Sequence, residues 1–373
     1  MRAARGSVAA VTVAVMICAG GAAHGQVPAV DVDPLQALTQ VGVDGRYPGL
    51  IGAVRVDDEN RYARMGFGDL WARIPADTSA QFRIGSITKT FVATVMLQLE
   101  GEGKLSLDDT VEHWLPGLVP GGDLITVRQL LNHTAGLNEY TNDPAVQAAI
   151  LTDIDTGQSF TPRQLVDIAL AMPSLAAPGE RFIYTNTAYI LAGMVITAVT
   201  GHTPGTEVAD RIVAPLRLQH TSFPVQDRQL HGNWLHGYMY GRDVSFVDPG
   251  IGGAAFAMVS TLDDLMVFTT ALVTGRLLPP AQMREMSMMV PLHKPGNGYG
   301  LGIEILTTDC GPVWVTLGGV LGYASGVLVS IDGTRQLAFA ANEYRLDLNL
   351  EPDPSLLLAA ESSYCQLGQH GGL

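Results

Sequence analysis

The chain is poor in charge and especially in lysine, and both shortages limit its possible partners. Only 16% of its 373 residues are charged, and 22 basic side chains against 36 acidic ones give a formal net charge of −14. Lysine occurs at three positions, Lys89, Lys104 and Lys294. Because a phosphate backbone is bound by clustered positive charge, this composition excludes nucleic acid as a partner.

Signatures of metal, cofactor and membrane binding are also missing from the sequence. The nine histidines include no His-Glu-x-x-His pattern, and His231 and His236 are five residues apart, which places them on different faces of a helix. Residues 298–302 read Gly-x-Gly-x-Gly but lack the P-loop lysine and the Rossmann spacing. The apolar stretch 188–199 is shorter than the ~20 residues that span a bilayer. We therefore predict no metal, no cofactor and no membrane span after residue 25.

The first 25 residues have the three-part form of a secretory signal. Arg2 and Arg5 precede an apolar run over 8–19, and small residues follow up to Gly25. We predict that this segment is removed before Gln26, so the protein is secreted or periplasmic. Removal of the segment leaves two cysteines, at positions 310 and 365. An oxidising compartment favours one disulfide between them, and the alternative is two separate buried thiols.

The apolar pattern predicts strands near both ends of the chain and helices between them. Extended and short apolar runs, the later ones separated by Gly and Asp turns, predict strands at 50–56, 61–67, 300–306, 312–316, 326–331 and 337–341. Helical spacing over 86–100 predicts the best-defined helix. Thr-x-x-Gln capping boxes at Thr126 and Thr161 predict two helix starts, and 356–362 is expected to form a last helix.

This order predicts a single α/β domain over 26–365. Residues 26–105 and 298–365 are expected to form an antiparallel sheet flanked by helices, and 106–297 an inserted, mostly helical lobe. Residues 366–373 are expected to form a flexible tail.

The tetrapeptide Ser86-Ile87-Thr88-Lys89 combines a nucleophile with a proton acceptor. It places a hydroxyl at a helix N-terminus and an amine one turn later, with their Cβ atoms about 5 to 6 Å apart. Desolvation and the helix dipole both lower the proton affinity of such a lysine, so it can activate a serine at neutral pH. The alternative interpretation is an N-cap serine followed by a surface lysine.

The sequence around this tetrapeptide resembles the superfamily of class C β-lactamases and D-Ala-D-Ala carboxypeptidases. The resemblance rests on segments 82–89 (FRIGSITK), 97–105 (LQLEGEGKL), 125–137 (ITVRQLLNHTAGL), 178–186 (PGERFIYTN), 260–265 (STLDDL) and 298–302 (GYGLG). It covers nearly the whole chain after residue 25, and the nearest likeness is to secreted carboxypeptidases. It implies a β-lactamase/transpeptidase-like fold, and a cysteine pair in those carboxypeptidases matches Cys310 and Cys365.

A second family motif, Tyr-x-Asn, occurs twice, at Tyr140 and at Tyr184. Only Tyr184 follows the family's Pro-Gly-x-x-Phe, so we assign the motif there and expect Tyr140 to be an exposed loop residue. The resemblance implies that the Tyr184 phenol, acidified by Lys89, carries protons between Ser86 and the leaving group. It also implies that the Asn186 amide holds a substrate carbonyl.

Another candidate base is His133, but no serine stands in a Gly-x-Ser-x-Gly elbow. We therefore expect this histidine to make only local hydrogen bonds.

The third motif departs from the family's Lys-Thr-Gly or His-x-Gly. The segment 315–320 reads VTLGGV, and counting places either Thr316 or Leu317 in the position of the cation. Gly318 and Gly319 still permit close backbone approach, with an oxyanion donor near Gly319 or Val320. Glu304 stands where the nearest carboxypeptidases carry an arginine. Leu-Gly-Gly resembles the Trp-Gly-Gly of β-lactamase-like carboxylesterases.

These residues together predict an exported serine hydrolase that acts through an acyl-enzyme. The resemblance implies a D-Ala-D-Ala carboxypeptidase-like scaffold that acts on a small-molecule or peptidoglycan-derived peptide or ester. The alternatives are a carboxylesterase, a class C-like β-lactamase and a penicillin-binding protein without efficient turnover.

Overall fold

The computed structural model describes residues 35–43, 47–56, 59–148, 159–344 and 354–367. The predicted signal peptide over 1–25 lies outside these ranges, as do residues 368–373 of the predicted tail. Helix α13 ends at Leu367, so the tail prediction is wrong for residues 366 and 367, which continue the last helix.

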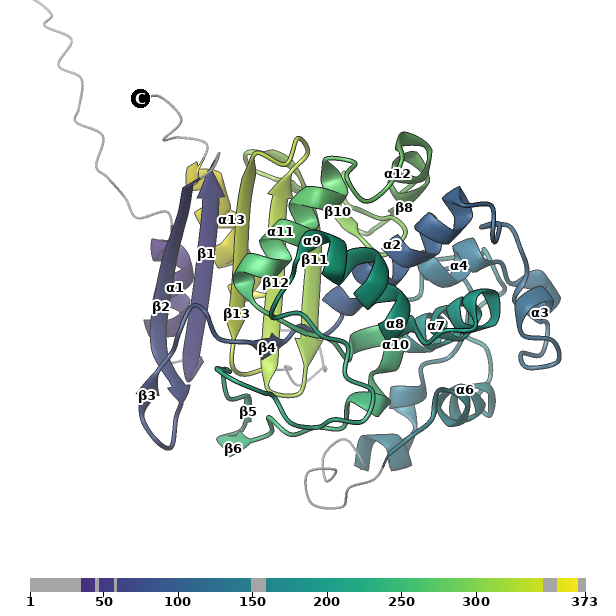
Figure 1. Cartoon of the computed structure of the whole chain (residues 1–373), viewed down its shortest axis with the longest axis horizontal. Coiled ribbons are helices and arrows are strands. Elements are labelled where there is room, and N and C mark those ends of the chain that lie inside the picture. The colour runs from purple at the N-terminus through teal and green to yellow at the C-terminus, as the bar shows by residue number, and fades with distance from the viewer. Residues whose placement is uncertain (1–34, 44–46, 57–58, 149–158, 345–353, 368–373) are drawn as a thin grey trace, which may run out of the picture. The chain divides into compact units, whose positions relative to one another are not determined.

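An antiparallel sheet joins the two ends of the described chain (Figure 1). Its nine strands follow the order β3-β2-β1-β13-β12-β11-β10-β9-β8. Their bounds are β1 Gly49–Val56, β2 Glu59–Asp69, β3 Ile74–Pro75, β8 Val290–Pro291, β9 Gly298–Tyr299, β10 Glu304–Thr308, β11 Gly311–Val320, β12 Tyr323–Ser330 and β13 Arg335–Ala341. Leu50 of β1 lies opposite Ala341 of β13. This sheet and its helices confirm the predicted α/β class.

Helices cover both faces of the sheet (Figure 1). Helices α1 (Gln36–Val43) and α13 (Ser355–Leu367) pack on one face, and α2 (Ile87–Gly101) and α11 (Leu262–Val273) on the other. The remaining helices lie between α2 and β8 in the chain: α3 Val111–Trp114, α4 Val127–Leu131, α6 Pro162–Leu170, α7 Asn186–Thr200, α8 Pro204–Val208, α9 Ala214–Leu216, α10 Gly253–Phe256 and α12 Pro280–Met286. No helix within the described ranges is both long enough and apolar enough to cross a membrane.

The apolar runs of the last strands follow from burial on both faces. Seven of the eight residues of β12 are buried, and one hydrophobic cluster lies on each side of the sheet. Helix α2 is also buried nearly all round, since it runs between the sheet and the helical lobe. Burial of this kind removes the need for alternating polar residues.

The predicted strand over 300–306 is only partly correct, because β10 begins at Glu304. Gly302 has φ +78°, a left-handed conformation that ends the pleat. A Cβ atom there would lie 2.5 Å from the Ala93 Cβ and 2.9 Å from the Tyr189 hydroxyl. The backbone therefore bends here to pass close to α2 and α7.

Cys310 and Cys365 form a disulfide, as predicted. The bond joins the turn between β10 and β11 to the C-terminal helix α13. It closes a sequence separation of 55 residues, and it attaches α13 to the sheet beside the strand that borders the candidate site.

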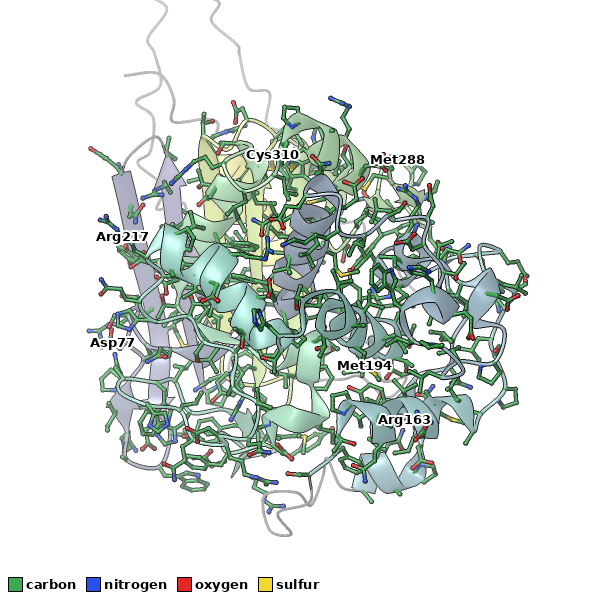
Figure 2. The ribbon with its side chains drawn as sticks, turned by 45° about the vertical axis from the view of Figure 1, so that its right-hand side comes forward. Asp77, Arg163, Met194, Arg217, Met288 and Cys310 are labelled. Atoms are coloured by element: carbon green, nitrogen blue, oxygen red, sulfur yellow. A yellow bond between two sulfur atoms is a disulfide. The ribbon has the colours of Figure 1, made fainter. Side chains whose placement is uncertain are left out.

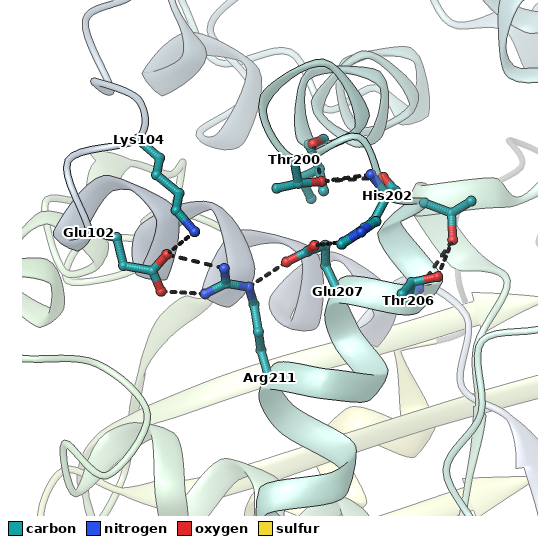
Figure 3. Close-up of polar contacts among 9 residues, drawn as sticks. Glu102, Lys104, Thr200, His202, Thr206, Glu207 and Arg211 are labelled. Carbon is teal, nitrogen blue, oxygen red and sulfur yellow. Dashed lines mark hydrogen bonds and ion pairs between the residues drawn. The ribbon is translucent and has the colours of Figure 1, made fainter.

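An ion-pair network joins the end of α2 to the lobe (Figure 3). Arg211 pairs with Glu102 at 2.5 Å and with Glu207 at 2.5 Å. Lys104 also contacts Glu102, and His202 contacts Glu207. The hydrogen bond from Arg211 lowers the pKa of Glu102 to about 2. Arg211 is thus the shared partner of two carboxylates.

Candidate active site

Ser86 precedes the first turn of α2 and is the accessible residue of a buried segment. Within 82–97 every other residue is buried, while Ser86 is half-buried. The preceding strand β4 (Phe82–Arg83) is anchored by the buried Arg83, which donates to the carbonyl of Ser245 at 3.1 Å. This anchor fixes the approach of the chain to Ser86.

Lys89 is buried, and its amine lies 3.0 Å from the Ser86 Oγ. The same Nζ donates to the Asn186 Oδ1 at 2.8 Å and to the carbonyl of Ala255 at 3.1 Å. Desolvation lowers the pKa of Lys89 to about 7, against an opposing effect of Glu139. A substantial fraction of Lys89 is therefore neutral at physiological pH and can accept the Ser86 proton.

Tyr184 stands across the site from the sheet, with 42% of its side chain exposed. Its hydroxyl shares a hydrogen bond with Ser86, and the Lys89 Nζ lies 4.8 Å from the centre of its ring. Desolvation raises the pKa of the phenol, and the Ser86 hydrogen bond only partly offsets that effect. At rest Tyr184 is a neutral phenol, which makes Lys89 the stronger candidate for the base.

The Asn186 side chain is oriented by Lys89. Because its Oδ1 accepts a hydrogen bond from Lys89 Nζ, its Nδ2 is the group that can donate to a substrate carbonyl. Its backbone N–H donates to the carboxylate of Glu139, which also accepts from the Thr141 N–H at 3.1 Å. Sequence reasoning missed Glu139, which supports the start of α7.

His133 is fully buried beside Tyr184, and its expected local bonding is wrong. Its Nδ1 accepts from the backbone of Thr185 at 3.3 Å, and its Nε2 lies 3.2 Å from the Tyr299 hydroxyl. Its ring centre is 4.2 Å from that of Tyr184. Burial and the nearby Lys89 lower its pKa, so the imidazole is neutral and packs against the Tyr184 ring.

Tyr140 is also misplaced by the sequence prediction, because it is fully buried. Its hydroxyl donates to the carbonyl of Ile251 at 2.6 Å. The tyrosine of the first Tyr-x-Asn is therefore a buried residue that directly follows Glu139 in the chain.

Strand β11 lies directly against the segment before the nucleophile. A Cβ on Gly318 would lie 1.9 Å from the carbonyl oxygen of Ile84, and one on Gly85 would lie 2.8 Å from the backbone nitrogen of Gly319. Glycine at these positions lets the two backbones touch. The backbone N–H groups of Ser86 and Gly319 are therefore candidates for the oxyanion site.

The two alignments of the third motif are separated by side-chain direction. The Thr316 hydroxyl lies 2.7 Å from that of Thr90 on α2, whereas Leu317 packs on the cluster of the opposite sheet face. Thr316, whose hydroxyl faces α2, is therefore the better candidate for the position of the family's cation. Sequence counting could not make this choice, because both residues belong to one continuous strand.

A small pocket opens beside Ser86 between Tyr184 and β11. Its described lining is Ser86, Tyr184, Tyr299, Gly302, Ile303, Glu304, Val315, Thr316 and Leu317. Glu304 is the only one of these with a charged side chain. Desolvation raises its pKa to about 7, so the pocket disfavours a second negative charge.

Known proteins are similar to this chain in both sequence and fold. It is 26% identical over 353 residues to penicillin-binding protein 4* of Bacillus subtilis, covering 88% of this chain and 74% of that protein. The solved D-stereospecific amidohydrolase from Streptomyces sp. is 38% identical with a TM-score of 0.80, over 88% of this chain and 97% of that one. The D-amino acid amidase from Ochrobactrum anthropi SV3, complexed with L-phenylalanine amide, is 25% identical with a TM-score of 0.79, over 90% and 98%.

The family assignment rests on a match that covers most of the chain. The model of the β-lactamase family matches residues 33–359, a range that contains every candidate residue above. The chain belongs to the β-lactamase family and is a serine hydrolase.

Proposed function

We propose that this enzyme forms an acyl-enzyme on Ser86 and prefers acyl donors whose leaving group carries no carboxylate. The preferred substrates are amino acid amides and short esters, ahead of D-Ala-D-Ala peptides. One observation carries this proposal: among the described residues that line the pocket beside Ser86, Glu304 is the charged one, and neither Thr316 nor Leu317 supplies a cation. A substrate carboxylate placed there would meet repulsion and desolvation together.

In the proposed reaction, neutral Lys89 takes the Ser86 proton while Oγ attacks the substrate carbonyl. The developing oxyanion accepts hydrogen bonds from the backbone N–H groups of Ser86 and Gly319. Tyr184 donates its phenolic proton to the leaving nitrogen or oxygen and regains a proton from the Lys89 ammonium. A water molecule then gives a proton to Lys89 as its oxygen attacks the carbonyl of the acyl-enzyme. The bond to Ser86 Oγ breaks, Oγ takes that proton back from the Lys89 ammonium, and the carboxylic acid product leaves. Asn186 Nδ2 holds the substrate through a carbonyl oxygen.

The similar enzymes support an amide as one substrate class. Two of them are named as a D-stereospecific amidohydrolase and a D-amino acid amidase. An amino acid amide has no leaving-group carboxylate, and its ammonium would be favoured beside Glu304. An ester needs only the oxyanion donors, so the esterase alternative shares the same site.

Export is part of the proposal. The signal-like segment 1–25 and the disulfide between Cys310 and Cys365 both support a secreted or periplasmic enzyme.

The test compares kcat/KM for three substrates: a D-amino acid amide, p-nitrophenyl butyrate and a D-Ala-D-Ala peptide. We expect the peptide to have the lowest value. The combined variant Thr316→Lys with Glu304→Arg should raise the peptide's value relative to the ester, with Glu304→Arg alone as the control. A peptide-to-ester ratio well above one in the native enzyme would refute the proposal.

A further inference from the structure

A second cavity, of about 380 Å³, lies inside the helical lobe and apart from the pocket beside Ser86. One side is a single face of α7, formed by Ile190, Gly193, Met194 and Thr197. Gly253 and Ala254 of α10 form its floor. The first turn of α6 closes another side of the cavity. Figure 2 labels Met194 on α7 and Arg163 on α6. This volume is in the range of small-molecule sites.

The chemistry of the lining favours an uncharged ligand. Proline, phenylalanine, valine, isoleucine and methionine side chains make up most of its surface, and its hydroxyl and carboxylate groups already hold internal partners. The Thr197 hydroxyl donates to the carbonyl of Gly193 at 3.2 Å. The Asp248 carboxylate accepts from the Ser159 hydroxyl at 2.5 Å and from the Gly250 N–H at 2.8 Å. Binding a charged group here would cost desolvation, and the Asp248 carboxylate is already engaged with other groups of the protein.

The two helices that enclose this cavity also hold the amine of Lys89. Helix α7 begins with Asn186, and α10 contains Ala255, so these helices supply two of the three hydrogen-bond acceptors that Lys89 Nζ has among the described residues. The helices touch at the cavity floor: a Cβ on Gly193 would lie 2.6 Å from that of Ala254. A molecule bound between the two helices therefore acts on Lys89, because a displacement of either helix moves one of its hydrogen-bond acceptors.

We propose that this cavity binds an uncharged, largely apolar small molecule, and that its occupancy alters the hydrogen bonding of Lys89. The ligand separates α7 from α10 and weakens the bonds to Asn186 or Ala255. Those bonds stabilise the ammonium form, so occupancy favours the neutral amine. The pH at which acylation becomes fast therefore moves downward. This inference goes beyond the proposed function, since the binding itself needs no turnover.

Binding is tested on the full chain with the neutral apolar fluorophore N-phenyl-1-naphthylamine. We expect saturable binding at one site. Thr197→Phe places a larger side chain in the cavity and should weaken binding at least about tenfold. Ala198→Phe is the matched control, because Ala198 is the next residue of α7, is exposed and does not line the cavity. It should bind as the native protein does.

Val225→Trp, on the loop across the cavity, gives a second block that leaves α7 unchanged. No saturable binding in the native protein, or binding by the Val225 and Thr197 variants as tight as that of the native protein, would overturn the site.

Coupling is tested by the rate at which a fluorophosphonate labels Ser86, measured against pH with and without saturating probe. We expect the rising limb to shift to lower pH in the native protein and in Ala198→Phe, and to stay in place in Thr197→Phe. Binding with an unmoved limb would overturn the coupling to Lys89. Failure of the proposed substrate preference would leave both measurements intact, because neither uses an amide or ester substrate.

Discussion

Glu304 should destabilise the folded enzyme at neutral pH, and Glu304→Gln should remove that cost. Desolvation raises the folded-state pKa of Glu304 from 4.5 to about 7. A shift of this size corresponds to about 3 kcal/mol at most, and we expect about 1 to 3 kcal/mol after relaxation and partial solvent contact.

The pH dependence follows from the direction of the shift. Between pH 4.5 and about 7 the folded protein keeps a proton on Glu304 that the unfolded chain releases. Stability therefore falls as pH rises through this window, and the full cost is present above pH 7. At pH 4 both states are protonated, and glutamine closely matches the neutral acid in shape and charge.

The assay is urea unfolding, followed by tryptophan fluorescence with the disulfide intact, at pH 4 and pH 8. Glu304→Gln should raise the free energy of unfolding by about 1 to 3 kcal/mol at pH 8 and by less than about 0.5 kcal/mol at pH 4. Glu59→Gln, at an exposed position of β2, is the control and should change little at either pH. No gain at pH 8, or an equal gain at both pH values, would refute the reasoning about Glu304.

Three other predictions concern the base, the ion-pair network and the disulfide. Lys89→Ala and Tyr184→Phe should each lower kcat/KM for a good ester by about 100-fold or more. The double variant should lose much less than the product of the two single losses, because the two residues act as one proton relay. Near-normal turnover in either single variant would contradict the relay. Arg211→Met should lower the free energy of unfolding by about 1 to 3 kcal/mol, because the carboxylate of Glu207, which has little exposure, loses its arginine partner and keeps only His202. Arg163→Met at an exposed pair should cost under about 0.5 kcal/mol, and equal losses in urea unfolding would count against the network. Cys310→Ser should cost roughly 2 to 4 kcal/mol by the same assay, and native protein denatured without reductant should take up no iodoacetamide at either disulfide cysteine.

Features that depend on neighbouring residues were predictable from the sequence. The capping boxes at Thr126 and Thr161 are both present in the structure, because each needs only a side chain and a backbone three residues away. The strands near both ends were recognised from apolar runs. The closeness of Ser86 and Lys89 also follows from helix geometry alone.

Features set by distant packing were not predictable. His133 bonds to the backbone of Thr185, 52 residues away, and no local pattern distinguishes that contact from a turn. Tyr140 looked like a loop residue, yet its ring is enclosed by segments remote in sequence. Glu304 was singled out by position, but its raised pKa comes from tertiary burial.

The central claim is that Ser86 carries the acyl group, and mass spectrometry of the labelled protein tests it most directly. After incubation with a fluorophosphonate, the native enzyme should gain one adduct, located on the peptide that contains Ser86. Ser86→Ala should gain none while keeping the native unfolding transition. An adduct on another serine, or an unchanged adduct in Ser86→Ala, would contradict the account.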